Sequence, residues 1–125
     1  MTEAGLKQRT KQFALRVLKL VNALPKTTAG RVLGNQLARS GTSVGANYRA
    51  ACRGRSKAEF IAKLGVVEEE ADESVYWMEL IMEADLLPKE RVRPLCREAG
   101  ELTAIMAASR ISASAGQIAN PKSKV

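Results

Sequence analysis

Apolar residues recur at three- and four-residue spacing along almost the whole chain, and no stretch alternates long enough to predict a strand. The spacing predicts helices over about residues 6–24, 28–53, 57–86 and 89–113. Four helices of about 20 to 30 residues joined by short turns are typical of an all-α fold, the antiparallel up-down four-helix bundle. No internal repeat is visible.

Each predicted helix carries one apolar stripe, which we expect to face the bundle core. The stripes are Leu6, Phe13, Val17, Leu20 and Leu24; Leu33, Leu37, Val44, Tyr48 and Ala51; Phe60, Leu64, Val67, Ala71, Ser74, Met78 and Ile81; and Leu95, Ala99, Leu102, Met106 and Ser109. The second helix also contains Gly30, Gly34, Gly41 and Gly45. Each glycine costs a helix about 1 kcal/mol relative to alanine, so we expect these positions to mark the close approach of another helix.

Local signals mark the helix ends. Pro25 stops the first helix, and either Thr27 or Thr28 can cap the second. The sequence 56–59 (SKAE) has the form of a capping box at the start of the third helix. The last helix fades near Ala113, so we expect a bundle domain over residues 1–113. Residues 114–125 read as a disordered tail.

Charge is distributed very unevenly along this pattern. Residues 1–58 contain 12 Lys/Arg and a single acid, Glu3, whereas residues 59–86 contain nine Asp/Glu and a single base, Lys63. The formal net charge of the whole chain is +7. Net charge indicates partners rather than fold, and this split favours a surface for polyanions beside an acidic helix that can pair with basic neighbours.

Composition excludes much enzyme chemistry. The chain has no histidine, which removes Ser-His-Asp and Cys-His catalysis and histidine-based metal sites. Cys52 and Cys96 are the only cysteines and form no metal or redox motif, so we interpret them as buried thiols. We expect no enzyme activity, cofactor or metal. Apolar runs are too short to span a membrane, and with no apparent secretory signal the cytoplasm is the expected location.

A basic run in the second helix is the first candidate binding site. Arg39, Arg49 and Arg53 fall within about 80° of one another on a helical wheel, with Arg55 and Lys57 at the end of the helix. Guanidinium groups suit phosphate because their planar fork donates two hydrogen bonds at once. The alternative is that these arginines pair with acids of the third helix, in the same subunit or in a neighbour.

The first helix adds further cations. Arg9, Arg16, Lys19 and Lys26 share one broad face, which would extend a polyanion surface or be an ordinary solvated stripe. We count Arg16 and Lys19 among the nucleic-acid-binding candidates. Aromatic side chains that could stack on bases are scarce, so contact with the nucleic-acid backbone is favoured over base readout.

The third helix offers a candidate subunit interface. Residues 68–73 (EEEADE) place five carboxylates within two turns, where they repel unless cations lie nearby. Three interpretations of these carboxylates are open. They pair with the first or second helix, within or between subunits; they form an acidic docking face for another protein; or, least favoured, they bind a metal. Trp77 and Tyr76 make a second apolar face that either widens the core or meets another subunit. The interface candidates are Glu69, Glu73, Tyr76 and Trp77.

Three strings of this chain closely resemble the four-helix-bundle proteins encoded by intervening sequences in 23S ribosomal RNA genes. They are residues 33–51 (LGNQLARSGTSVGANYRAA), 57–61 (KAEFI) and 67–74 (VEEEADES), and residues 13–17 (FALRV) and the Trp77 neighbourhood are also similar. The likeness covers roughly residues 7–112.

The resemblance implies an up-down bundle that assembles into a ring, with five subunits expected. Similar bundles act as accessory proteins of diversity-generating retroelements, where contact with RNA and a reverse transcriptase is expected. The resemblance supplies no catalytic residue. A ring suits the charge split, because acidic faces can meet basic faces head to tail. We therefore predict a cytoplasmic, non-enzymatic, ring-forming RNA-binding bundle; the alternative is a protein-only scaffold whose basic face is used in subunit contacts.

Overall fold

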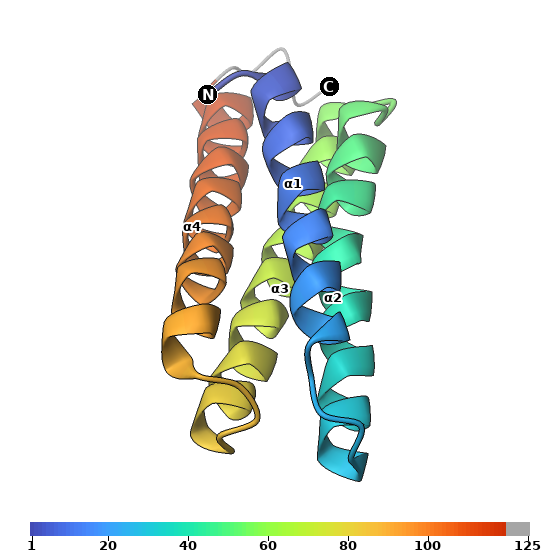
Figure 1. Ribbon diagram of the computed structural model, residues 1–125. Coiled ribbons are helices and arrows are strands. Elements are labelled where there is room, and N and C mark those ends of the chain that lie inside the picture. Colours follow the sequence, from blue (N-terminus) through green and yellow to red (C-terminus); the bar gives the residue numbers. More distant parts are fainter. Residues whose placement is uncertain (120–125) are drawn as a thin grey trace.

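The computed structural model describes the backbone of residues 1–119 and the side chains of residues 1–115. Four helices account for most of this part: α1 (Glu3–Asn22), α2 (Thr28–Cys52), α3 (Lys57–Glu83) and α4 (Lys89–Ala119). Consecutive helices run in opposite directions, as Figure 1 shows. The predicted all-α up-down four-helix bundle is confirmed, with no strand between residues 1 and 119.

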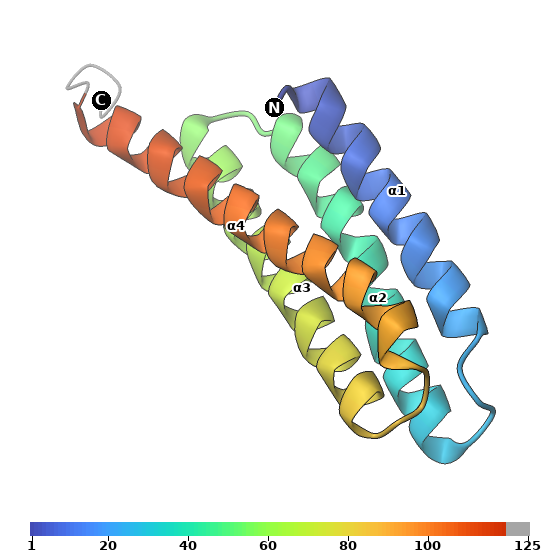
Figure 2. The ribbon, with the colours of Figure 1, turned by 60° about the vertical axis from the view of Figure 1, so that its left-hand side comes forward.

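The helices pack in sequence order. α2 packs along α1, α3 along α2 and α4 along α3, while α1 and α4 close the bundle through a much smaller contact. Figure 2 shows the C-terminal half of α4 leaning away from α1. The start of α1, the α2–α3 turn and the end of α4 therefore lie at one end of the bundle (Figure 1).

The predicted stripes form the core. Leu33, Phe60 and Ser109 are half-buried. The other stripe residues are buried, and Phe13, Val17, Leu37, Val44, Leu64, Met78, Ile81, Leu102 and Met106 have no exposed surface. Burial of apolar surface at this scale is the main force that holds such a bundle together.

Short polar side chains begin the first three helices. Thr2, Thr27 and Ser56 each accept a hydrogen bond from the backbone amide three residues on, which satisfies one of the free donors of the first turn. The capping box is formed in part: Ser56 Oγ accepts from the Glu59 amide at 3.1 Å. The Glu59 carboxylate accepts from the amide of Arg55 at 3.0 Å rather than from that of Ser56.

Three glycines of α2 allow α1 to approach closely. A Cβ atom at Gly41 would lie 2.8 Å from both methyl groups of Val17, and one at Gly45 would lie 3.2 Å from Thr10 Oγ1. A Cβ atom at Gly34 would contact Val21 and Leu24 at 3.3 and 3.2 Å. The predicted close helix approach is confirmed for these three glycines. At Gly30 the close neighbour is the turn instead, because a Cβ atom there would lie 2.0 Å from the carbonyl oxygen of Pro25.

The last helix is longer than the sequence predicts. α4 runs through Pro94 without a break and continues to Ala119, so residues 114–119 are helical rather than part of a tail. Pro94 stands in the second turn, where its missing amide removes only one helical hydrogen bond. Past Ala113, alanine and glutamine favour helix. The rest of the predicted tail, residues 120–125, lies outside the described residues. Between residues 1 and 119 no helix combines the length and apolarity that crossing a bilayer requires.

Candidate nucleic-acid and subunit interfaces

The structure divides the predicted basic face of α2 between two neighbouring helices. The Arg39 guanidinium is directed at α3, where Nη1 lies 3.3 Å from Glu70 Oε2 and Nη2 forms an ion pair with Glu73. Beneath this pair, the buried hydroxyls of Ser40 and Ser74 are hydrogen-bonded at 2.8 Å. The interpretation that α2 arginines pair with α3 acids in the same chain is therefore confirmed for Arg39.

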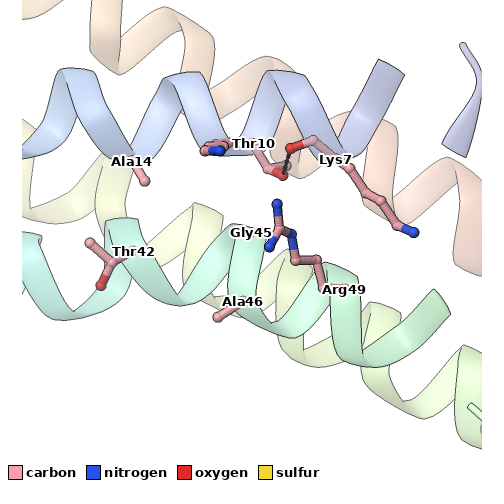
Figure 3. Close-up of a pocket in the computed structure, with 8 residues that line it drawn as sticks. Lys7, Thr10, Ala14, Thr42, Gly45, Ala46 and Arg49 are labelled. Atoms are coloured by element: carbon pink, nitrogen blue, oxygen red, sulfur yellow. Dashed lines mark hydrogen bonds between the residues drawn. The ribbon is translucent and has the colours of Figure 1, made fainter. Parts of the chain in front are cut away.

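Arg49 lies on the opposite flank of α2 and faces α1. It lines a groove together with Lys7 and Lys11, over a floor of small side chains. Figure 3 shows the Arg49 guanidinium directed toward α1 beside Thr10, whereas the Lys7 side chain extends along α1 away from it. No carboxylate lines this groove. Glu3 pairs with Lys7 at 3.3 Å on the exposed surface, so the three cations outnumber the acids at the groove by three to one.

The close packing of α1 on α2 explains this meeting of cations. Gly41 lies against Val17, and Gly45, one turn further along α2, lies against Thr10. Because the two helices are antiparallel, the next turn of α2, which carries Arg49, lies beside the turn of α1 that carries Lys7. The glycines thus fix a register that brings the three cations together.

Arg53, Arg55 and Lys57 are exposed at the α2–α3 turn. The Arg55 amide is bound by Glu59, but no side chain of this group forms an ion pair with any residue between 1 and 115. Arg49 lies one helical turn before Arg53, so these cations lie beyond the groove, toward the end of the bundle.

Arg16 and Lys19 lie on the other side of α1. Together with Arg91 of α4 they line a second groove, whose apolar wall is Leu20 and Leu95. The structure therefore does not bring Arg16 and Lys19 together with the cations of α2.

The Arg9 side chain is bound by two acids of α4. Its guanidinium donates to Glu98 at 2.7 and 2.8 Å and to Glu101 at 2.9 Å. The hydrogen bond to Glu98 is the main cause of an Arg9 pKa above its ordinary value. This contact fastens α1 to α4 and removes Arg9 from the polyanion surface.

The acidic run of α3 is spread over different neighbours. Glu70 and Glu73 bind Arg39, and Glu68 binds Arg110 of α4 at 2.8 Å. Glu69 and Asp72 are exposed and form no ion pair within residues 1–115. In the same part of the chain, no three Asp, Glu or Cys side chains are grouped so that they could hold a metal ion.

The predicted interface aromatics differ in exposure. The Tyr76 side chain is 53% exposed, whereas Trp77 is half-buried against the core. The Trp77 indole donates to Glu73 at 3.2 Å, so Glu73 holds both Arg39 and Trp77. The two rings meet edge to face with centroids 5.1 Å apart. Trp77 therefore widens the core, and Tyr76 is the aromatic available to a partner.

An apolar groove continues this face toward the other end of the bundle. Val32, Leu33 and Leu80 line it, with Ala29 and Ala84 at its edges. The Val32 side chain is 53% exposed. Sequence reasoning did not single out this groove, because Val32 reads as one apolar residue outside the main stripe.

The two cysteines are free thiols and both are half-buried. Burial is the main cause that raises the pKa of Cys52 and of Cys96 above the ordinary thiol value. Burial also raises the pKa of Tyr48, which neighbours Cys52. A raised pKa leaves a smaller fraction of each thiol as the nucleophilic thiolate near pH 7.

Sequence reasoning missed three cations of the two grooves: Lys7, Lys11 and Arg91. A signal for the first two exists. Lys7 and Lys11 are one helical turn apart on the flank of α1 that carries Ala14. The glycines of α2 could have supplied the register that places this flank against Arg49.

Comparison with known proteins agrees with this architecture. The family model for the 23S rRNA-intervening sequence protein matches residues 3–108. A crystal structure of a protein of unknown function from the S23 ribosomal protein family of Bacteroides thetaiotaomicron VPI-5482 superposes with a TM-score of 0.81 at 31% identity, covering 88% of this chain and 98% of that one. No curated protein matches the chain significantly. With a matching family model that spans most of its length and a bundle of the same shape, the chain belongs to the 23S rRNA-intervening sequence protein family.

Proposed function

We propose that this protein is a cytoplasmic, non-enzymatic bundle that associates with copies of itself and binds structured RNA through its basic end. The observation that carries the proposal is that the cations of α2 and of the α2–α3 turn differ in their ion pairing. Arg39 is neutralised by two α3 carboxylates, while Arg49, Arg53, Arg55 and Lys57 form no ion pair among the residues described. Unpaired cations gathered at one end attract the phosphates of RNA. When these cations neutralise phosphates, the counterions condensed on the RNA are released.

Self-association is supported by the α2–α3 face. It combines the apolar groove around Val32 and Leu80 with the exposed Tyr76 ring and the exposed acids Glu69 and Asp72. An apolar centre beside acids suits a partner surface with a basic rim. Because the chain is basic apart from residues 59–86, a second copy supplies such a rim. Head-to-tail repetition of this contact gives a ring where the rotation between copies closes. We expect five subunits, as the family resemblance implies.

Salt-dependent binding tests the RNA proposal. A labelled RNA hairpin should bind more weakly as salt rises, and Arg53→Gln or Arg55→Gln should each lower the slope of log affinity against log salt by about 1. Arg93→Gln is the matched control, because Arg93 is exposed on α4 near the opposite end of the bundle. If the wild-type protein does not bind the hairpin at about 50 mM salt, the RNA proposal fails.

The α2–α3 face also favours a second candidate, a protein-only scaffold. In that case Arg53→Gln or Arg55→Gln would dissociate the assembly, and RNA would not bind. Sedimentation velocity measures the assembly mass directly. Under our proposal, Tyr76→Ala and Val32→Glu reduce that mass, whereas Arg53→Gln leaves it unchanged.

A further inference from the structure

A row of cations crosses the outer surface of α1. Lys7, Lys11 and Lys19 stand four and eight residues apart, with Leu15 completing the four-residue spacing. Successive members of such a row turn by about 40° around the helix and advance about 6 Å along it. The row therefore starts on the α2 flank, where Lys7 and Lys11 line the first groove. It ends on the α4 flank, where Lys19 lines the second.

Each end of the row receives a further cation from a neighbouring helix. Arg49 of α2 joins Lys7 and Lys11 in the first groove, and Arg91 of α4 joins Arg16 and Lys19 in the second. The two grooves, described separately above, are thus the ends of one cationic track over α1. We define the track as Lys7, Lys11, Arg16, Lys19, Arg49 and Arg91.

Very little negative charge opposes the α1 and α2 members of the track. Glu3 is the only acid in residues 1–58, and it pairs with Lys7 at 3.3 Å on an exposed surface. The other five cations form no ion pair with any residue between 1 and 115. Arg9, on the same helix, shows the contrasting case, because Glu98 and Glu101 neutralise it.

We propose that an RNA backbone crosses α1 along this track, from the α1–α2 groove to the α1–α4 groove. This inference rests on the proposed RNA binding and names its path. Lys7 and Lys19 are about 18 Å apart along the axis, a span that covers several successive phosphates of one strand. The track contains no aromatic side chain, so it contacts phosphates without reading bases. Grooves at both ends suit a strand that wraps around α1 better than a flat lipid surface.

Charge removal along the track tests the path. Lys11→Gln and Lys19→Gln should each lower the salt slope for a labelled RNA hairpin by about 0.9, the value expected for one lost phosphate contact. Lys89→Gln on α4, which makes the same change on an exposed lysine off the track, should leave the slope unchanged. A hairpin of scrambled sequence should compete equally well, since the bases are not read.

Charge insertion at the middle of the track is the sharper test. The Leu15 side chain is 52% exposed, and that of Ile111 on α4 is 58% exposed. Leu15→Glu should weaken hairpin binding about fivefold, the effect of one close repulsion in water, whereas Ile111→Glu should have little effect. Circular dichroism and sedimentation velocity should show that both variants keep the fold and the assembly mass.

Several outcomes would overturn the path and leave the proposed function standing. One is loss of binding in Arg53→Gln with wild-type binding in Lys11→Gln, Lys19→Gln and Leu15→Glu. Another is a changed assembly mass in Leu15→Glu with unchanged RNA affinity, which would make this face a subunit contact. Loss of binding to phosphatidylserine vesicles, but not to RNA, in the lysine variants would assign the track to membranes. Absence of hairpin binding by the wild-type protein would overturn both proposals.

Discussion

Helix α2 packs against α3 on one flank and against α1 on the other, and the two contacts, here called the α2–α3 seam and the α1–α2 seam, are made by different kinds of residue. Against α3, the seam is closed by polar pairs: Arg39 with two carboxylates and Ser40 with Ser74. Against α1, the seam is closed by shape, with glycines that admit Val17 and Thr10. Close packing by small residues places no carboxylate in the α1–α2 groove. Lys7 pairs with the exposed Glu3, but Lys11 and Arg49 form no ion pair with any residue between 1 and 115, so they keep their charge for a partner. The contrast shows that a cation's role depends on which neighbouring helix its flank faces.

The α1–α2 seam should break most readily at Gly41. Gly41→Ala places a methyl group 2.8 Å from Val17, and overpacking of this kind costs about 1–3 kcal/mol. Gly100→Ala is the matched control, because a Cβ atom there meets nothing within 4 Å and alanine favours the helix by up to about 1 kcal/mol. Urea denaturation should show opposite shifts in midpoint; equal shifts would contradict the close approach.

The α2–α3 seam should respond to loss of its buried hydroxyl pair. Ser40→Ala or Ser74→Ala should each cost about 1 kcal/mol of unfolding free energy, the usual net value of one hydrogen bond. The double variant should cost less than the two single costs added together, because one shared bond is lost in all three proteins. Additive costs in urea denaturation would show that the two serines act independently.

The same substitution at Arg39 and at Arg49 should have different effects, because Arg39 lies at the α2–α3 contact and Arg49 at the α1–α2 contact. Arg39→Gln should lower the unfolding free energy by about 0.2–1 kcal/mol, as expected for exposed ion pairs, and leave RNA binding almost unchanged. Arg49→Gln should leave stability unchanged and lower the salt slope of RNA binding by about 1. A lower salt slope in Arg39→Gln, with an unchanged slope in Arg49→Gln, would mean that Arg39 leaves Glu70 and Glu73 to bind RNA.

The smallest expected effect concerns the thiols on either side of the bundle. The raised pKa values of Cys52 and Cys96 leave less thiolate at pH 8 than an ordinary cysteine has, so iodoacetamide should alkylate both more slowly than glutathione. Single variants Cys52→Ser and Cys96→Ser assign the two rates. In urea both thiols should react at the ordinary rate. Cys52 is the last residue of α2 and lies near Glu3 and Lys7 of α1, so fast alkylation of Cys52 in the folded protein would show that the α1–α2 seam opens at this end.

Periodicity was enough to predict the four helices and nearly every core position, because burial of apolar stripes dominates bundle folding. The cost of glycine in a helix predicted the role of Gly34, Gly41 and Gly45. Periodicity did not separate Arg39 from Arg49, since a helical wheel gives angles around one helix but not the helix that each flank meets. The pairing of Glu68 with Arg110 depends on long-range packing, which local patterns do not encode. The extension of α4 to Ala119 follows the helix propensity of residues past Ala113, which the fading apolar stripe concealed.

The small contact between α1 and α4 has a consequence for motion. α1 is held mainly by α2, so it is the helix whose detachment disrupts the fewest packed surfaces. Local opening of a protein starts at such weakly anchored units. We therefore expect amide hydrogens of α1 to exchange with deuterium before those of α2 and α3, and a polyanion bound across α1 to slow that exchange.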